Sequence, residues 1–291
     1  MSVRPALVSF AARHWPFAYG AGRIVETFGR DMALVSGERV VRTRDGFDMT
    51  VLADDFIGRH LLLAGSFDRP IAMLLVAFSE PGDQIIDVGA NIGYISALLL
   101  CHVADSHVVA IEPQPDLADL LTRNLLPFGR DRFVEHRVAL SDSPGEGFLH
   151  INRSNRGGSH IVDADDGDSI AIPLVDAAGI FDGLERLDLM KIDIEGHEEP
   201  VFRSALGALE RLQPRAILFE DHAGKAAPSG AIGVMLAAIG YRVYGIRKAL
   251  RGPRLAPVTE ASARQCCDFL AVSTRRDLPS AGRALLSGQP A

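Results

Sequence analysis

The pattern of apolar and polar positions along the chain predicts strands that alternate with helices. In residues 84–100, apolar strand formers lead to Asp87, a Gly-x-Asn-x-Gly turn follows, and apolar residues at helical spacing begin at Ile95. The same succession of strand, polar end and helix returns further along the chain. Further strands are predicted at residues 108–112, 132–142, 187–196 and 215–222, and further helices at 116–125, 198–212 and 232–239.

This alternation predicts an α/β fold. Strands that are apolar along most of their length, each followed by a helix, are typical of a doubly wound, mostly parallel sheet that is covered on both faces. Residues 241–246 and 267–273 are predicted as closing strands with no helical pattern between them. We therefore expect them to form an antiparallel pair at one edge of the sheet.

The middle of the chain contains segments that fit the alternation less well. Residues 147–151 are predicted as a strand of a peripheral excursion. Residues 170–175 are predicted as an edge strand, because Pro173 cannot donate a hydrogen bond to a central ladder. Residues 152–168 are rich in Gly, Ser, Asn and Asp, which predicts a long loop and a candidate lid over a ligand.

The first part of the chain follows a different pattern. Residues 1–36 are weakly amphipathic and are broken by Pro16, which favours a short packing arm over a membrane or partner helix. Asp45-Gly46 between two apolar runs indicates a β-hairpin. Pro70 fits the first turn of the next helix, with Asp68 near its cap. We predict an N-terminal extension of helix and hairpin at residues 1–60, a core domain at 61–280 and a C-terminal tail at 281–291.

Composition narrows the classes of function. The 291 residues carry a net charge of −7 without a sustained basic stretch, which argues against a nucleic-acid partner. The three cysteines, Cys101, Cys266 and Cys267, form no disulfide framework or zinc spacing, so a reducing cytoplasmic compartment is predicted. The longest apolar runs, such as residues 71–78, are too short for a transmembrane segment.

Polar residues follow the ends of the predicted strands, where ligands bind in doubly wound sheets. A dinucleotide site would show Gly-x-Gly-x-x-Gly, but Asn91 replaces the second glycine, and the carboxylate of Asp87 would repel a pyrophosphate. A cationic ligand with an amine, a sulfonium and a ribose would instead suit Asp87, and its ribose hydroxyls would suit Glu112 at the next strand end. The residues therefore favour S-adenosylmethionine.

The motifs that carry this interpretation resemble a known family. Asp-Val-Gly-Ala-Asn-Ile-Gly from Asp87, Ala-Ile-Glu-Pro around Glu112, Val-Ala-Leu-Ser-Asp and Met-Lys-Ile-Asp-Ile-Glu-Gly-His-Glu are similar, in this order, to the FkbM family of S-adenosylmethionine-dependent methyltransferases. The resemblance covers roughly residues 61–222 and implies a Rossmann-like sheet with an antiparallel C-terminal strand. It implies cofactor contacts from Asp87, Gly89, Asn91 and Gly93 at the methionine end, Glu112 at the ribose, and Ala139, Leu140 and Ser141 beside the adenine.

One position departs from the family pattern. Where the family often has Gly-x-Tyr-Glu before the first motif, this chain has Gly65-Ser-Phe67-Asp68, so its carboxylate is one methylene shorter. Residues 1–60 and the closing strands lie outside the motifs. We expect substrate choice and any homo-oligomer contacts to be encoded there.

Carboxylates and a histidine at the ends of the fourth and fifth strands are candidates for the chemistry. Asp193 and Glu195 would point to one side if their strand continued so far, near Glu220 and His222. In one interpretation, Asp193 or His222 accepts the proton of an acceptor hydroxyl, and Asp193, Glu195 and His222 are the predicted catalytic residues. In another, Asp193, Glu195, Glu220 and a histidine hold a divalent metal, which stays open and is not part of the predicted site. In a third, these residues are structural.

The resemblance further implies an enzyme that uses S-adenosylmethionine to methylate a hydroxyl of a small sugar or polyketide-type natural product, and this is the predicted function. Two alternatives stay open, an NAD-dependent oxidoreductase and a non-catalytic S-adenosylmethionine-binding protein. The acceptor itself is not encoded in a recognisable motif, because acceptor pockets are built from variable loops.

Overall fold

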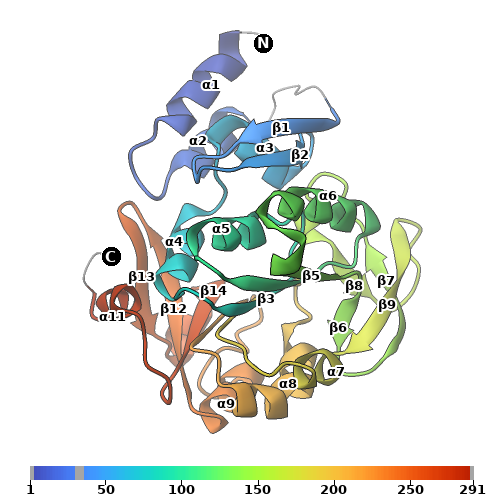
Figure 1. Ribbon diagram of the computed structural model, residues 1–291, viewed down its shortest axis with the longest axis vertical. Coiled ribbons are helices and arrows are strands. Elements are labelled where there is room, and N and C mark those ends of the chain that lie inside the picture. The colour runs from blue at the N-terminus through green and yellow to red at the C-terminus, as the bar shows by residue number, and fades with distance from the viewer. Residues whose placement is uncertain (1–2, 30–35, 289–291) are drawn as a thin grey trace.

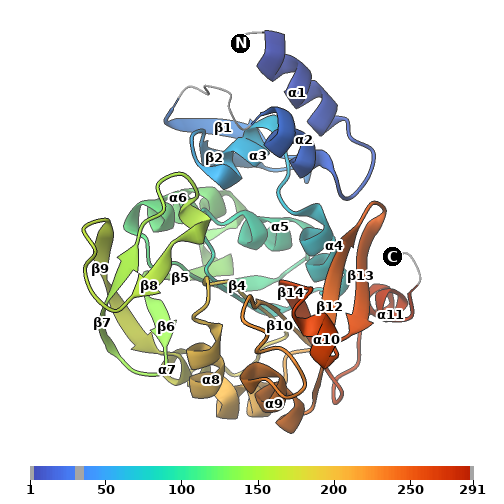
Figure 2. The same ribbon diagram turned by 180° about the vertical axis from the view of Figure 1, so that it is seen from behind.

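An eight-stranded sheet forms the centre of the molecule, with helices on both faces (Figures 1 and 2). Its strands are β3 (Gln84–Val88), β4 (His107–Ile111), β5 (Phe133–His136), β10 (Leu189–Ile192), β11 (Ala216–Glu220), β12 (Tyr241–Ala249), β13 (Gly252–Pro257) and β14 (Asp268–Ser273). They lie in the order β13-β12-β14-β11-β10-β3-β4-β5 in this computed structural model, which describes residues 3–29 and 36–288. Neighbours from β11 to β5 are parallel, whereas β14 is antiparallel to β11 and β12. The predicted α/β fold, with its doubly wound, mostly parallel sheet and antiparallel C-terminal strand, is confirmed.

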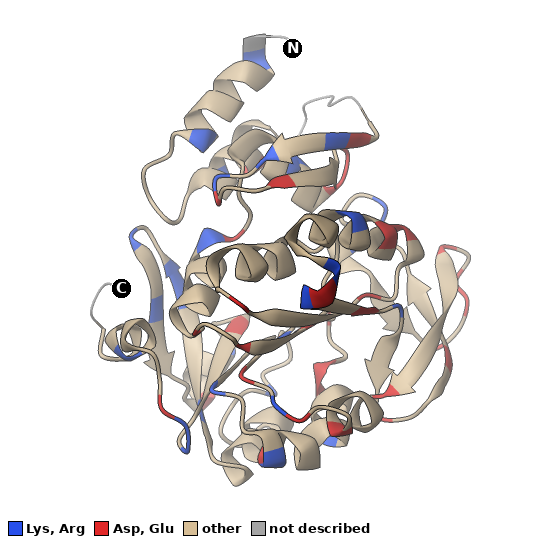
Figure 3. Ribbon diagram, viewed as in Figure 1, with Lys and Arg blue, Asp and Glu red and all other residues tan. Residues whose placement is uncertain are grey.

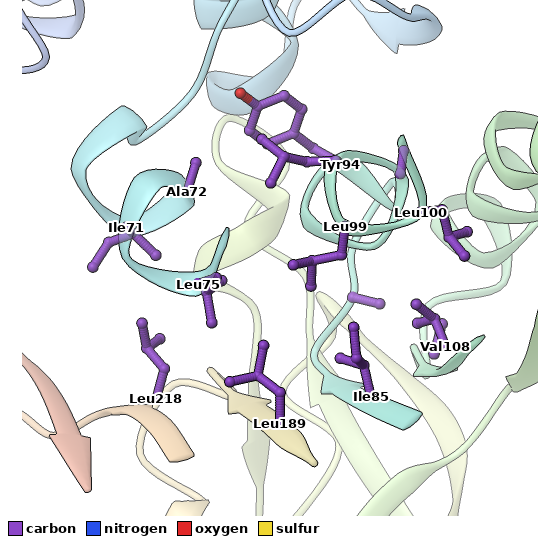
Figure 4. Close-up of a cluster of buried hydrophobic side chains, with 14 of the residues drawn as sticks. Ile71, Ala72, Leu75, Ile85, Tyr94, Leu99, Leu100, Val108, Leu189 and Leu218 are labelled. Carbon is purple, nitrogen blue, oxygen red and sulfur yellow. The ribbon is translucent and has the colours of Figure 1, made fainter. Parts of the chain in front are cut away.

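Alternation along the strands divides the core between the two faces. Ile85 of β3 belongs to one buried cluster and Ile86 to the other, as expected for successive side chains of a strand. In Figure 4, Ile85 and Leu189 point from their strands toward Leu99 on a covering helix. The first face is covered by α4 (Arg69–Ala77), α5 (Tyr94–His102), α6 (Pro115–Leu125) and α11 (Ser280–Leu286), and the second by α7 (Ala177–Asp182), α8 (Glu198–Leu212) and α9 (Ala231–Ala238).

Charged residues are sparse in the parallel strands and more frequent at strand ends, in loops, on helices and on β12 and β13 (Figure 3). Asp87, within β3, and Lys191, within β10, are exceptions that matter for the site below. Burying an Ile or Leu side chain contributes roughly 1.5–3 kcal/mol, so the two apolar layers dominate the stability of the sheet. The strand ends are thereby held in fixed positions relative to one another.

The N-terminal extension packs above the sheet and contains the predicted hairpin. It consists of α1 (Val3–Arg13), α2 (Ala21–Phe28), β1 (Glu38–Arg42), β2 (Asp48–Leu52) and α3 (Phe56–Ala64). The hairpin prediction around Asp45-Gly46 is confirmed, since β1 and β2 pair antiparallel and Gly46 has φ 96°. Val8 and Ala12 of α1 pack against Val25 and Leu63, so this segment is a packing arm in the structure. The predicted boundary at residue 60 falls within α3, and the predicted boundary at residue 280 falls at the first residue of α11. The division into domains stays a prediction.

The strand predicted at 132–142 is wrong as a single element. Its first part is β5, whose ladder with β4 ends at His136, and its last part is β6 (Ala139–Ser141), which belongs to a separate four-stranded sheet. That sheet has the order β6-β9-β7-β8 and also contains β7 (Gly145–His150), β8 (His160–Val162) and β9 (Ser169–Asp176). The chain therefore leaves the central sheet after β5 and returns only at β10.

The prediction that 170–175 forms an edge strand is also wrong, because β9 lies between β6 and β7. Pro173 is tolerated since β6 pairs only with Leu174 and the two residues after it, so Pro173 itself has a strand on one side only. Residues 152–168 are not entirely a loop, as they include β8 and the short 3-10 helix η3 (Arg156–Gly158). Short 3-10 turns also follow α6, at η1 (Leu126–Phe128) and η2 (Arg130–Arg132).

The C-terminal edge differs from the prediction by one strand. β12 and β14 pair antiparallel as expected, but β13 was missed and forms the edge, followed by the short helix α10 (Glu260–Ala263). Residues 1–2 and 30–35 of the predicted extension and 289–291 of the predicted tail lie outside the described residues. Across the described part of the chain, no single helix is long and apolar enough to cross a membrane; α3 and α4 meet the length and composition test only as a pair bent by 85°.

Candidate functional site

A pocket lies beyond the carboxyl ends of the parallel strands, where doubly wound sheets bind their ligands. Residues after β3, β4 and β10 form its polar side, and residues after β5, together with the four-stranded sheet, form an apolar side. Of the residues predicted from the sequence, the pocket is lined by Asp87, Gly89, Asn91, Glu112, Ala139, Leu140 and Asp193. Gly93, Ser141, Glu195 and His222 are not part of its lining.

The turn after β3 requires its glycines for packing against neighbouring elements as well as for the approach of a ligand. Gly89 has φ +76°, and a Cβ atom there would lie 2.0 Å from the backbone oxygen of Asp193. Gly93 has φ +82° and faces Leu121 of α6, where a Cβ would come within 3.3 Å. Glycine is thus required at 89 by close packing against the end of β10, and at 93 by packing of the turn on α6.

Glu112 is the most completely organised acid of the pocket. One carboxylate oxygen accepts a hydrogen bond from the backbone N–H of Asn91 at 2.9 Å, and the other accepts one from the N–H of Gln114 at 2.9 Å. The side chain is buried, and burial raises the pKa of Glu112 to about 7 despite these two donors. Each oxygen keeps a further lone pair, so the carboxylate can accept two hydroxyl groups from a ligand in the pocket.

Asp87 does not face the pocket as an isolated charge. Its Oδ2 accepts a hydrogen bond from Ser96 at 2.7 Å, and its Oδ1 lies 3.3 Å from the Nζ atom of Lys191. Lys191 also lies 3.5 Å from Asp193 Oδ2 and donates to the backbone oxygen of Gly89 at 3.2 Å. Burial lowers the pKa of Lys191, but Asp87 and Asp193 outweigh it, so the net shift is upward. Lys191 thus pairs with two acids, and the charge of Asp87 is largely balanced before any ligand binds.

The predicted lid covers the pocket through specific contacts. Arg156, Gly157 and Ser159 contribute to its lining. The backbone N–H of Arg156 donates to Asp55 Oδ1 at 2.8 Å, and the backbone oxygen of Arg156 accepts from Gln114 Nε2 at 3.0 Å. The guanidinium of Arg156 also binds Asp116 of α6. Sequence reasoning missed Gln114 and Arg156, although the position of Gln114, two residues after Glu112, was a usable signal.

The strand β10 ends before the predicted catalytic residues, which changes their arrangement. Glu195 has φ 52° and Gly196 has φ 97°, so the backbone turns instead of continuing as a strand. Glu198 fixes this turn by accepting hydrogen bonds from the N–H groups of Ile194 at 3.1 Å and Gly196 at 3.2 Å. The expectation that Asp193 and Glu195 share one side of a continuing strand is therefore wrong.

A crowded group of carboxylates lies beside Asp193 at the ends of β10 and β11. One ligand atom from each of Glu195, Glu220 and His222 lies within 4.8 Å of the others, and His222 Nε2 is 3.2 Å from Glu220 Oε1. Burial, together with the nearby charges of Asp193 and Glu195, raises the pKa of Glu220 to about 9. The structure thus brings together the residues predicted for catalysis, at the rim of the pocket.

The remaining predicted residues have structural partners. Ser141 Oγ lies 3.0 Å from His197 Nε2, which ties β6 to the start of α8. Asp68, the acid that departs from the family pattern, lies 2.6 Å from Lys248 Nζ, and Lys248 also pairs with Asp268 at 2.8 Å. The shorter carboxylate is therefore held by a lysine of β12, next to the crowded acids.

Comparison with known proteins decides the family. The sequence model of the FkbM methyltransferase domain matches residues 87–243 of this chain. The chain belongs to the FkbM methyltransferase family. The matched region runs from the Asp87 turn to β12 and so includes every strand end that lines the pocket. Membership of this family favours the methyltransferase interpretation over an NAD-dependent oxidoreductase.

Individual relatives are more distant. The hexuronic acid methyltransferase AglP of Haloferax volcanii is 29% identical over 163 residues, which cover 54% of this chain and 63% of that protein. The protein-L-isoaspartate O-methyltransferase of Methanopyrus kandleri is 41% identical over 57 residues, which cover 19% of this chain and 25% of that protein. The chain thus spans less than two thirds of the length of either relative.

A solved structure of methyltransferase FkbM from Methylobacillus flagellatus has 15% identity and a TM-score of 0.45, with 75% of this chain and 53% of that chain covered. The O-methyltransferase TomG from Streptomyces achromogenes, in complex with SAM, has 15% identity and a TM-score of 0.40, with 72% and 82% covered.

Proposed function

We propose that this protein is an S-adenosylmethionine-dependent O-methyltransferase that acts on a hydroxyl group of a small sugar or polyketide-type molecule. The observation that carries the proposal is the carboxylate of Glu112, which two backbone amides orient at the centre of the pocket with lone pairs left for a ribose. A family match that begins at the Asp87 turn supports the same cofactor. S-adenosylmethionine, when bound, would supply a methyl group from its sulfonium, and the sulfur would become the thioether of S-adenosylhomocysteine.

The residues of the pocket fit this cofactor from end to end. Asp87 Oδ1 accepts no hydrogen bond from the described residues, so it can accept one from the amino group of the methionine moiety while Lys191 balances its charge. Asn91 and Gly89 line the same end, and Glu112 lies at the centre. Ala139 and Leu140 give an apolar wall for the base, whereas Gly93 and Ser141 act by shaping the turn and the strand around it.

Asp193 is the residue best placed to accept the proton of the acceptor. It lines the pocket, and its side chain is 44% exposed, so an acceptor hydroxyl can reach it from solvent. As the bond between the acceptor oxygen and the methyl carbon forms, that oxygen gains positive charge and its proton becomes strongly acidic. A carboxylate is then a sufficient base, and the proton moves from the oxygen to Asp193. Glu195, Glu220 and His222 form a cluster at the neighbouring strand ends, where the exposed imidazole of His222 can exchange a proton with solvent.

The acceptor class is inferred from two observations. The carboxyl groups around Asp193 offer several hydrogen-bonding oxygens, which suits a polyhydroxylated molecule. The relative AglP is described as a hexuronic acid methyltransferase, which supports a sugar acceptor.

The three cysteines are all free thiols, which supports the predicted cytoplasmic compartment.

Calorimetry and a turnover assay test the proposal together. S-adenosylmethionine and S-adenosylhomocysteine should each bind the full chain in a one-to-one complex, and a panel of hydroxylated sugars and polyketides should yield a methyl ether and S-adenosylhomocysteine. Absence of heat with both nucleosides would refute the cofactor assignment. Binding without turnover across the panel would favour the non-catalytic alternative. Unchanged initial rates in EDTA would dismiss a metal held by Glu195, Glu220 and His222.

A further inference from the structure

Gln114 carries a buried acceptor atom that the protein itself does not satisfy. The residue is only 4% exposed and lines the pocket. Its Nε2 donates to the backbone oxygen of Arg156 at 3.0 Å, and a carbonyl oxygen can only accept, so the orientation of the amide is fixed by its partner. Oε1 has no hydrogen-bond partner among residues 3–29 and 36–288. Buried acceptors are rarely left in this state, which points to a donor on a ligand.

The order of the strands shows which part of a ligand lies near this atom. The neighbours β3, β4 and β5 present Asp87, Glu112 and Val138 in turn along the edge of the sheet. A ligand whose ribose binds Glu112 therefore extends toward Asp87 on one side and toward β5 on the other. The β5 side is walled by apolar residues, which suit a flat base: Pro113, Val138, Ala139, Leu140, Leu149 and Ile161.

We propose that Oε1 of Gln114 accepts a hydrogen bond from the 6-amino group of the adenine, so that Gln114 selects the base of the cofactor. This inference rests on the proposed function, because it takes S-adenosylmethionine as the ligand. Glu112 accepts the N–H groups of Gln114 and Asn91 and keeps its remaining lone pairs for the ribose, so Oε1 of Gln114, two residues further along the chain, is the acceptor left for the base. A base with an oxygen at position 6 would place two acceptors against each other and would be rejected.

The anchoring of the amide makes the selection rigid. Nε2 holds Arg156, and Arg156 is held in turn by Asp55 and Asp116, so the amide cannot rotate to offer its NH₂ group without losing the contact to the lid. Adenine and 6-oxopurine nucleosides are therefore distinguished by a group with one fixed polarity.

Titration of two ligands into two proteins tests this assignment. S-adenosylhomocysteine should bind the unmodified chain roughly 10-fold or more tightly than S-inosylhomocysteine, in which an oxygen replaces the amino group. In Gln114→Met, which keeps the length of the side chain without its carbonyl, this ratio should fall close to one. Gln114→Asn, which withdraws the same amide by one methylene, should lower the ratio as well if the methionine variant does not fold.

Ile161→Val is the matched control, since it trims the apolar wall without altering a polar group. It should weaken both nucleosides alike and keep their ratio. An unmodified chain that does not discriminate, or a Gln114→Met variant that loses both nucleosides equally, would overturn the assignment of Gln114 alone. A chain that binds neither nucleoside would instead overturn the proposed function.

Discussion

The two ends of the pocket treat their carboxylates in opposite ways. At the cofactor end, Asp87 is paired with Lys191 and Ser96, and Glu112 receives two backbone amides, so each buried charge has its own partner. At the proposed acceptor rim, Glu195 and Glu220 lie together with a histidine, neither pairs with a lysine within residues 3–29 and 36–288, and both have a raised pKa. The carboxylates of the first end are thus already paired or hydrogen-bonded, whereas those of the second end repel one another.

This difference indicates how the two ends divide their work. Satisfied charges favour tight, invariant recognition, which a common cofactor requires. Crowded carboxylates destabilise the free protein, and a bound molecule with many donor hydroxyls would relieve part of that cost. Four substitutions test whether the carboxylates of the two ends differ in this way.

Asp193→Asn should have the largest effect, because it removes the proposed proton acceptor while keeping the shape of the side chain. We expect kcat to fall by roughly 10²–10⁴-fold. Single-turnover methyl transfer at saturating S-adenosylmethionine measures it. Asp142→Asn is the control, since Asp142 is a strand-end acid that pairs with Arg203 and is not part of the pocket lining. An Asp193→Asn variant with near-normal kcat would remove Asp193 from the chemistry.

Lys191→Met should reveal how much the cofactor end depends on paired charge. Removing the lysine leaves Asp87 buried without its cation, which costs roughly 3–5 kcal/mol of unfolding free energy. Urea denaturation gives this value directly. Lys225→Met breaks a more exposed pair with Glu199 and should cost at most about 1 kcal/mol. Equal losses in the two variants would contradict the view that Asp87 needs its partner.

Glu112→Gln should weaken S-adenosylhomocysteine by roughly 10–100-fold, since an amide offers fewer acceptors to the two backbone donors and the ribose. The pH dependence is a second signature. The pKa of Glu112 is raised to about 7, so in the unmodified chain the ionised acceptor is lost, and affinity falls, as pH drops from about 8 to about 6. Calorimetry across this range should show a flat profile for Glu112→Gln. A parallel decline in both proteins would assign the titration to another group.

Glu220→Gln should have the smallest effect and the opposite sign, because it removes a source of repulsion. The carboxyl ionises near its usual pKa of 4.5 in the unfolded chain but only near about 9 in the folded chain. As pH rises between these values, the unfolded state of the unmodified protein is favoured increasingly. The Tm of Glu220→Gln should therefore exceed that of the unmodified protein by roughly a few degrees. This difference in Tm should be larger at about pH 8 than at about pH 5. A gap that narrows with rising pH would show that Glu220 is not under strain.

Local patterns in the sequence predicted the elements that depend on local chemistry. The α/β alternation, the hairpin at Asp45-Gly46, helix α8 and the Asp87 turn all follow from spacing and turn residues. The departure of the chain from the central sheet after β5 did not, because it depends on which distant strand offers a free edge. Likewise, Pro173 predicted an edge strand because proline lacks a backbone N–H. The strand is nevertheless internal, because β6 is short and its ladder begins only at Leu174.

The site divides along the same line. Carboxylates at strand ends were recognisable because the topology of a doubly wound sheet places them together. The turn at Glu195, however, is created by Glu198 and Gly196, and the fixed amide of Gln114 depends on Arg156 from 42 residues further along the chain. The contact between Gln114 and Arg156 joins segments whose separation in sequence carries no signal, whereas the contacts of Glu198 are local and depend on a side-chain orientation that the residue pattern does not encode.

The contact between Gly89 and the carbonyl of Asp193 has a consequence for engineering. It places the backbone of the cofactor turn directly against the backbone that carries Asp193, with no side chain between them. If Asp193 is the proton acceptor that we propose, its separation from the methyl donor is set by these two main-chain segments and not by the covering loops. Exchanging residues 152–168 or the N-terminal helices to accommodate a new acceptor should therefore leave the transfer distance intact. A single methyl group at position 89 should disturb it.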